Sequence, residues 1–179
     1  RLHKLILDLL SLARIESAEE AYELLPISIA STVKTCFEEY LPVAETKGTL
    51  LTAEPPPDEV VVWADEEGLL TVLNNLVDNA IKYTPAGGRV VVRWRLDGRR
   101  AVIEVQDTGI GIPKQHQARV FERFFRVDKA RSRELGGTGL GLSIVKHWAQ
   151  VFGGSADVAS EVGRGSTLSV RLPAVSPLA

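Results

Sequence analysis

Hydrophobic residues at the start of the chain recur every three or four positions, which places them on one face of a helix. The pattern fades after Ser17. It predicts a short bundle helix over residues 1 to about 17 whose apolar face needs a partner. We therefore divide the chain into a helical segment, 1–18, and a larger domain, 19–179. The apolar positions are Leu2, Leu5, Ile6, Leu9, Leu12 and Ala13.

Residues 22–65 alternate between strand-like and helical patterns. We expect strands at 22–27, 49–53 and 60–63 from their composition and the turn residues around them. A helix over 29–47 has Ser28 in the cap position and ends at Gly48. Pro42 should kink or restart that helix. Asp65 stands where a cap for the next helix belongs.

The remainder of the chain predicts a mixed sheet. A helical pattern over 66–84 stops at Pro85-Ala-Gly-Gly88, and two strands follow at 89–96 and 100–106, joined by Asp97-Gly98. A glycine-rich loop, a helical patch, a polar lid at 126–138, a helix near 139–152 and a hairpin complete the chain. Because tight turns join neighbouring strands, we expect an α/β (α+β) sandwich, a mixed sheet covered on one face by helices.

The helix predicted over 66–84 has two different faces. Asn75, Asn79 and Lys82 lie within about 60° of one another on one side. Amide oxygens beside a cation suit the magnesium salt of a triphosphate, but the same spacing is typical of a solvated helix face. The opposite side is an apolar stripe of Leu69, Leu73, Leu76, Val77 and Ala80.

Two glycine-rich loops follow. Asp107-Thr-Gly-Ile-Gly-Ile-Pro113 comes after a strand, so a carboxylate is exposed at a tight turn and can accept a hydrogen bond from an exocyclic amine. Gly136-Gly-Thr-Gly-Leu-Gly141 opens directly into a helix, where free backbone N–H groups favour anions. Neither loop matches a P-loop or a dinucleotide fingerprint. The Asp-Thr-Gly triplet also occurs in aspartic proteases, and each loop alone is compatible with an ordinary turn.

Composition narrows the function classes. The 179 residues are 45% hydrophobic and 25% charged, which excludes disorder and fits one globular domain with an appended element. A net charge of −2 argues against nucleic-acid binding. The single cysteine, Cys36, cannot form an internal disulfide. The apolar run from Leu5 to Ala13 is too short to span a membrane, and a chain that begins at Arg1 and lacks methionine is expected to be part of a longer protein.

Four segments, taken in order, closely resemble the N, G1, F and G2 boxes of sensor histidine kinases of two-component systems. They are Asn75-Leu-Val-Asp-Asn-Ala-Ile-Lys-Tyr-Thr84, Asp107-Thr-Gly-Ile-Gly-Ile-Pro113, Phe121-Glu-Arg-Phe-Phe-Arg-Val-Asp128 and Gly137-Thr-Gly-Leu-Gly-Leu142. Residues 2–16 resemble the second helix of that family's dimerisation and phosphotransfer hairpin, and Gly163-Arg-Gly-Ser-Thr167 resembles its closing hairpin. The resemblance implies the Bergerat (GHKL) fold, which gyrase, the MutL mismatch-repair proteins and the heat-shock chaperone ATPase share, with ATP under a mobile lid.

The resemblance also implies roles for matching residues. Asn79 would bind Mg²⁺ with Asn75 assisting, Lys82 and Tyr83 would face the nucleotide, and Asp107 would select adenine through its amino group. Phe121, Phe124 and Phe125 would pack the lid hinge rather than stack on the base. Candidates to neutralise the γ-phosphate are Arg126, Lys129, Arg131 and Arg133. Completing the expected nucleotide-binding set are Gly109, Gly111, Ile112, Gly137, Thr138, Gly139, Leu140 and Gly141.

Asn75 separates a kinase from a hydrolase. In the resembled pattern, hydrolytic relatives carry a glutamate base at this position, and an amide cannot take a proton from water. We therefore expect a protein-histidine kinase whose γ-phosphoryl acceptor is a histidine, with onward transfer to a response regulator. The family's acceptor segment, His-Glu/Asp-Leu-Arg-x-Pro, is absent, and we expect His3, His116 and His147 to be structural or solvated. We predict that the chain binds ATP but cannot phosphorylate itself.

The remaining expectations come from the resemblance alone. The partners would be the dimerisation helices that carry the acceptor histidine and a receiver domain, with a homodimer in the full-length protein and no nucleic acid. This domain would be cytoplasmic and its parent anchored in the inner membrane. The alternative is a nucleotide-binding regulator or serine kinase of the same superfamily, like the anti-sigma factors. A bundle helix over residues 1–17 favours the kinase over that alternative.

Overall fold

The computed structural model describes residues 6, 10, 13, 22–128 and 137–175. Its centre is a five-stranded sheet with the order β2-β4-β5-β7-β6. Strands β2 and β4 are parallel, and the other three pairings are antiparallel, so the predicted mixed sheet is confirmed. The strands are β2 (Leu50–Glu54), β4 (Arg89–Asp97), β5 (Arg100–Asp107), β6 (Ser155–Glu161) and β7 (Gly165–Pro173).

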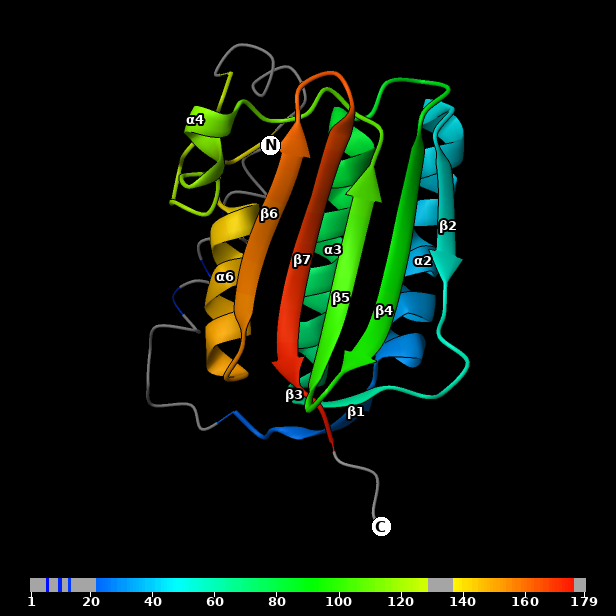
Figure 1. The fold of residues 1–179 in the computed structure, drawn as a ribbon, viewed down its shortest axis with the longest axis vertical. Coiled ribbons are helices and arrows are strands. Elements are labelled where there is room, and N and C mark those ends of the chain that lie inside the picture. Colours follow the sequence, from blue (N-terminus) through cyan, green and yellow to red (C-terminus); the bar gives the residue numbers. More distant parts are fainter. Residues whose placement is uncertain (1–5, 7–9, 11–12, 14–21, 129–136, 176–179) are drawn as a thin grey trace.

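Three helices cover one face of this sheet and leave the other open, as Figure 1 shows. They are α2 (Ile29–Lys47), α3 (Glu66–Tyr83) and α6 (Gly141–Val151). The open face is polar: Arg95 pairs with Glu104 at 2.9 Å, and Arg171 pairs with Asp157 at 2.7 Å. Charged pairs on the outward side of the pleat explain why a single helical layer is enough. The predicted sandwich is confirmed.

The helix at the centre of the layer follows its sequence pattern. Asp65 caps α3 as predicted, because its carboxylate accepts a hydrogen bond of 2.7 Å from the N–H of Gly68. Residues 69, 73, 76, 77 and 80 of the predicted apolar stripe are buried. They belong to the hydrophobic core, so the side of α3 that carries the two asparagines faces away from this core. Burial of the apolar stripe therefore determines on which side of α3 the Asn75 and Asn79 side chains lie.

Helix α2 differs from expectation at two residues. It runs without interruption through Pro42, so the helix does not restart there, and the alternative expectation of a kink stays a prediction. Pro42 and Glu38, whose carbonyl loses a helical partner, lie on the exposed side, where water can replace that bond. Ser28 holds the cap position but its side chain makes no capping bond. The helix ends at Gly48 in the left-handed conformation, as predicted.

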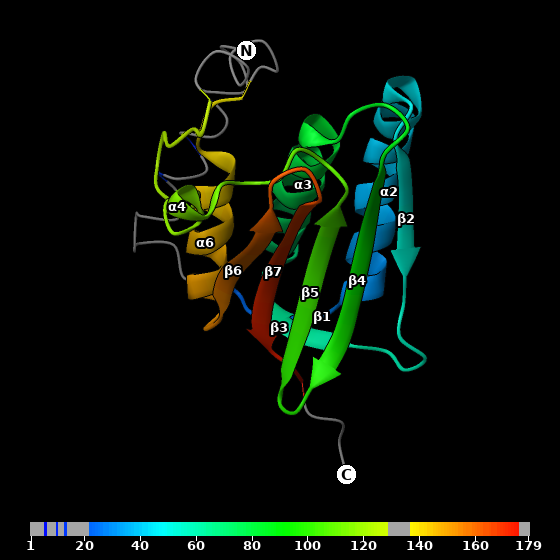
Figure 2. The same cartoon turned by 45° about the horizontal axis from the view of Figure 1, so that its top comes forward.

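Two smaller features complete the described fold. Strands β1 (Leu25–Ser28) and β3 (Val61–Ala64) form a separate two-stranded antiparallel sheet. The short helix α4 (Lys114–Gln117) lies beside the N-terminal end of α6 in both views (Figures 1 and 2). Of the predicted bundle helix, Ile6, Leu10 and Ala13 are helical and exposed, and its other residues lie outside the described part. No described helix is long and apolar enough to cross a membrane.

Candidate functional site

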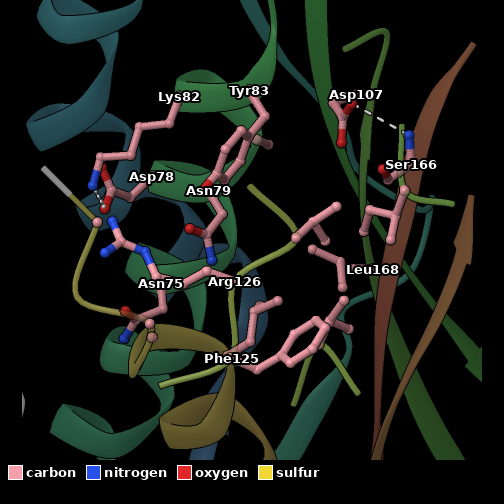
Figure 3. Close-up of a pocket in the computed structure, with 18 of the residues that line it drawn as sticks. Asn75, Asp78, Asn79, Lys82, Tyr83, Asp107, Phe125, Arg126, Ser166 and Leu168 are labelled. Atoms are coloured by element: carbon pink, nitrogen blue, oxygen red, sulfur yellow. Dashed lines mark hydrogen bonds and ion pairs between the residues drawn. The ribbon is translucent and has the colours of Figure 1, made fainter. Parts of the chain in front are cut away.

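A cavity of about 150 Å³ lies between α3, the loop after β5, strand β7 and the start of α6. Figure 3 shows side chains from these segments converging on it. The structure therefore brings together residues that are up to about 90 positions apart along the chain. Most of the predicted site lines this cavity: Asn75, Asn79, Lys82, Tyr83, Asp107, Gly111, Ile112, Arg126, Gly137, Thr138, Gly139 and Gly141.

The amides of α3 form one wall. The Asn75 side chain donates from Nδ2 to the carbonyl of Thr71 at 2.9 Å, which leaves its Oδ1 for other partners. This oxygen faces the first residue of α6: a Cβ on Gly141 would lie only 2.7 Å from it. A larger residue at position 141 would therefore force the Asn75 side chain to move. The spacing of Asn75 and Asn79 places both amides on the cavity side (Figure 3).

Two cations accompany these amides. Lys82 forms an ion pair with Asp78 at 2.6 Å, one helical turn earlier, and both residues line the cavity. Arg126 approaches the same region (Figure 3), and its Nε and Nη2 atoms are buried without a hydrogen-bond partner among the described residues. Leaving two buried nitrogens of a half-buried guanidinium unpaired is costly, so this arrangement favours an anionic ligand. Lys129, Arg131 and Arg133 lie outside the described residues.

Asp107 lies at the opposite end of the cavity, on the last residue of β5. It is 6% exposed, and its Oδ1 accepts bonds from the backbone N–H of Gly109 at 2.8 Å and of Ser166 at 3.2 Å. Burial raises the pKa of this carboxyl, and the two N–H donors partly offset the rise. Both of these bonds go to Oδ1, so the carboxylate retains the capacity to accept a further donor.

Sequence reasoning missed several cavity residues. Asp78 and Ser166 are polar, and the apolar lining comes from Ile110, Val120, Leu142 and Leu168. The i,i+4 spacing of Asp78 and Lys82 could have indicated their pairing. Ser166 belongs to the Gly163-Arg-Gly-Ser segment, but its contact with Asp107 depends on the β5–β7 register, in which these two residues are directly paired.

A few expected residues lie elsewhere. Leu140, assigned to nucleotide binding, has a wholly buried side chain in the core beneath the loop. Gly109 does not line the cavity, but its N–H fixes Asp107. Of the expected hinge phenylalanines, Phe121 packs against the core and Phe125 lines the cavity, whereas Phe124 is 58% exposed. Phe124 instead contributes its backbone N–H, which donates to Gly139 at 2.8 Å.

The donor set fits a magnesium ion that arrives with phosphate. Mg²⁺ prefers oxygen ligands and is commonly held by one or two protein groups together with substrate phosphates. Asn75 and Asn79 supply amide oxygens at the cavity wall. Among the described residues, no cluster of three or more His, Cys, Asp or Glu could hold an ion alone. Residues 75 and 79 would therefore share the ion with a bound polyphosphate.

Comparison with known proteins agrees with this geometry. The family described as histidine kinase-, DNA gyrase B- and HSP90-like ATPase matches residues 64–176, more than half of the chain. The chain belongs to this family. Within the family, the similar proteins are sensor kinases rather than anti-sigma-factor-like regulators. RppB of Synechocystis sp., a sensor histidine kinase, is 41% identical over 98% of this chain and 39% of its own length. SenX3 of Mycolicibacterium smegmatis, a sensor-like histidine kinase, is 43% identical over 97% of this chain and 45% of its own length.

Solved structures of histidine kinases share the fold. Full-length ShkA in complex with AMPPNP superimposes with a TM-score of 0.85 at 32% identity, covering 99% of this chain and 37% of ShkA. The mycobacterial sensor histidine kinase MprB gives 0.71 at 30% identity, covering 84% of this chain and 97% of the solved chain. This chain thus corresponds to the ATP-binding catalytic domain of sensor histidine kinases, and it spans less than half the length of the relatives RppB and SenX3. The anti-sigma-factor alternative is not favoured.

Proposed function

We propose that the cavity binds Mg·ATP and that the chain transfers the γ-phosphoryl group to a histidine on a dimerisation helix, as the catalytic part of a protein-histidine kinase. The observation that carries this proposal is the polarity of the cavity. One end presents a buried carboxylate acceptor, Asp107, and the other presents two amides and the cations Lys82 and Arg126. ATP has a matching polarity, with an amine on its base and anionic phosphates.

Each residue would have a role set by its position in the cavity. Asp107 would accept a hydrogen bond from the adenine amine, and Tyr83, Gly111 and Ile112 would enclose the base. Asn75 and Asn79 would hold Mg²⁺, which neutralises phosphate charge when bound. Backbone N–H groups at the start of α6 would approach the phosphates. The residues proposed there are Gly137, Thr138, Gly139 and Gly141.

The transfer step needs little covalent chemistry from this chain. A neutral imidazole nitrogen attacks the γ-phosphorus in line, the bond to the bridging oxygen breaks, ADP leaves and the imidazole loses its proton. Lys82 and Arg126 would stabilise the developing charge, and Arg131 is a further candidate outside the described residues. Asn75 provides no base for water, so hydrolysis is disfavoured.

Partners and cellular location follow from the same proposal. The acceptor histidine would belong to the protein's own dimerisation helices, which pair two copies, and a receiver domain of a response regulator would take the phosphoryl group. The parent protein would be anchored in the inner membrane with this domain in the cytoplasm. The similarity to sensor kinases supports these assignments.

Radiolabelling tests the reaction. The 179-residue chain is incubated with Mg²⁺ and γ-³²P-ATP, alone and with a separately prepared helical hairpin that carries a His-Glu-Leu-Arg-x-Pro segment. We expect no label on the chain, label on the hairpin, and none on a hairpin with His→Gln. Label on the chain itself would contradict the predicted inability to phosphorylate itself. Rapid release of inorganic phosphate without the hairpin would indicate a hydrolase.

A further inference from the structure

The side chain of Ser160, near the end of β6, lies where three segments meet. Its Oγ accepts a hydrogen bond of 2.7 Å from the N–H of Ile112, in the loop after β5. The same Oγ lies 2.9 Å from the carbonyl oxygen of Gly165 and 2.9 Å from Oγ of Ser166, on β7. A serine hydroxyl both donates and accepts, so one atom joins the loop to the strand. Ser160 itself does not line the cavity.

A second side chain supports the same junction. Gln117 of α4 donates from Nε2 to the carbonyl of Ile112 at 2.9 Å and to that of Ser160 at 2.8 Å. The N–H of Ile112 is thus held by Ser160 and its carbonyl by Gln117. Both polar groups of this loop residue are fixed, which is the condition under which a loop keeps one conformation.

The backbones of the loop and of the β6–β7 turn are in direct contact at this junction. The N–H of Gly163 donates to the carbonyl of Ile110 at 2.9 Å. Gly111 has a φ of 71°, and a Cβ there would lie 2.1 Å from the carbonyl oxygen of Glu161. Only glycine permits this approach. The position of the loop after β5 therefore depends on the β6–β7 turn, next to which Ser160 makes its hydrogen bonds.

This junction controls the carboxylate at the base end of the cavity. Oδ1 of Asp107 is held by two N–H groups, from Gly109 in the loop and from Ser166 on β7. Ser160 bonds both segments, so it fixes the separation between these two donors. We propose that Ser160 is a positioning residue for base selection: it orients Asp107 toward the amino group of adenine without touching the nucleotide. This inference rests on the proposed function, in which Asp107 selects adenine.

The experiment separates positioning from general support of the fold. Calorimetry measures the binding of ADP and of purine riboside 5′-diphosphate, which differ only in the 6-amino group, to the 179-residue chain. The variants are Ser160→Ala, Ser160→Thr, which keeps the hydroxyl, and Ser155→Ala, a control at an exposed serine on the same strand. ADP is used because it cannot donate a γ-phosphoryl group.

We expect Ser160→Ala to weaken ADP binding by about threefold to tenfold, the usual effect of one hydrogen bond, and to leave the binding of the analogue within about twofold. Ser160→Thr should restore much of the preference for ADP, and Ser155→Ala should match the wild type. Equal weakening of both ligands, or an unchanged ADP affinity, would overturn the inference and leave the proposed function intact. A wild-type chain that binds both ligands equally would instead contradict the role of Asp107, and the inference with it.

Discussion

Oδ1 of Asp107 accepts a hydrogen bond of 3.2 Å from the backbone N–H of Ser166, 59 positions further along the chain. The bond joins the last residue of β5, whose carboxylate we propose to select the base, to the neighbouring strand β7. Because the donor is a backbone group, it is preserved in any variant of Ser166 that keeps the strand. The side chain of Asp107 can therefore be changed while its surroundings stay in place.

Asp107→Asn should abolish the selective binding of adenine nucleotides while the protein remains folded. The amide oxygen can still accept the two N–H bonds at Oδ1, but an NH₂ group replaces the oxygen that we propose accepts the adenine amine. We expect ADP to bind at least about tenfold more weakly, since two donors then oppose each other. Calorimetry measures this, with Asp157→Asn on the exposed sheet face as the control. Full affinity in Asp107→Asn would remove Asp107 from the site.

The raised pKa of Asp107 gives the same variant a pH signature in stability. In the folded protein this carboxyl holds its proton more tightly than the ordinary value of 3.8 implies, because the charged form is buried. Ionisation of Asp107 therefore lowers the free energy of unfolding by its full amount above the raised pKa, and this loss disappears as the pH falls below 3.8. Asp107→Asn should be at least as stable as the wild type at neutral pH. Urea unfolding at several pH values measures this difference, which should shrink in acid; a difference that grows in acid would contradict the assigned cause.

Arg126→Ala should weaken phosphate binding in particular. Two buried nitrogens of Arg126 have no partner among the described residues, and a charged hydrogen bond to phosphate would satisfy them. We expect the affinity for ATP to fall by about tenfold or more, while adenosine binds as before, and we expect no loss of stability without nucleotide. Calorimetry with both ligands measures the contrast, and Arg95→Ala on the open sheet face is the control. Equal losses for ATP and adenosine would argue against a phosphate contact.

Lys47→Met should destabilise the end of the asparagine helix. Lys47, from α2, donates to the carbonyls of Ile81 and Lys82 in the last turn of α3, the second at 2.7 Å. A methionine leaves both carbonyls without this donor, so we expect a loss of about 1–2 kcal/mol in the free energy of unfolding. Urea denaturation measures it, with the exposed Lys34→Met as the control. If both variants unfold at the same urea concentration, the lysine does not stabilise the helix end.

Local pattern predicted the parts of the site that lie on one helix. The 3.6-residue period fixed the buried stripe of α3, and burial of that stripe placed Asn75 and Asn79 on the cavity side. Asp65 could also be predicted, since its bond to Gly68 spans three residues. In each case the interacting groups lie within a few turns of one helix, where sequence spacing and spatial spacing are equivalent.

Contacts that depend on strand register could not be predicted in the same way. Ser160 and Ser166 meet because β6 and β7 pair at those residues, and no periodicity in either strand reveals which serine faces Asp107. The expected restart of helix α2 at Pro42, which the structure does not show, was wrong for a different reason. The sequence shows the missing N–H but not that the neighbouring carbonyl is open to water.

In the proposed function, this cavity binds Mg·ATP through Asn79 at the phosphate end and Asp107 at the base end. Calorimetry with the non-hydrolysable analogue AMPPNP and Mg²⁺ tests it most directly, in the wild-type chain, Asn79→Ala and Asp107→Asn. We expect one binding site in the micromolar to millimolar range for the wild type. Both variants should bind markedly more weakly, and the loss in Asn79→Ala should shrink when Mg²⁺ is removed. Undiminished binding in both variants, or no binding by the wild type, would contradict the claim.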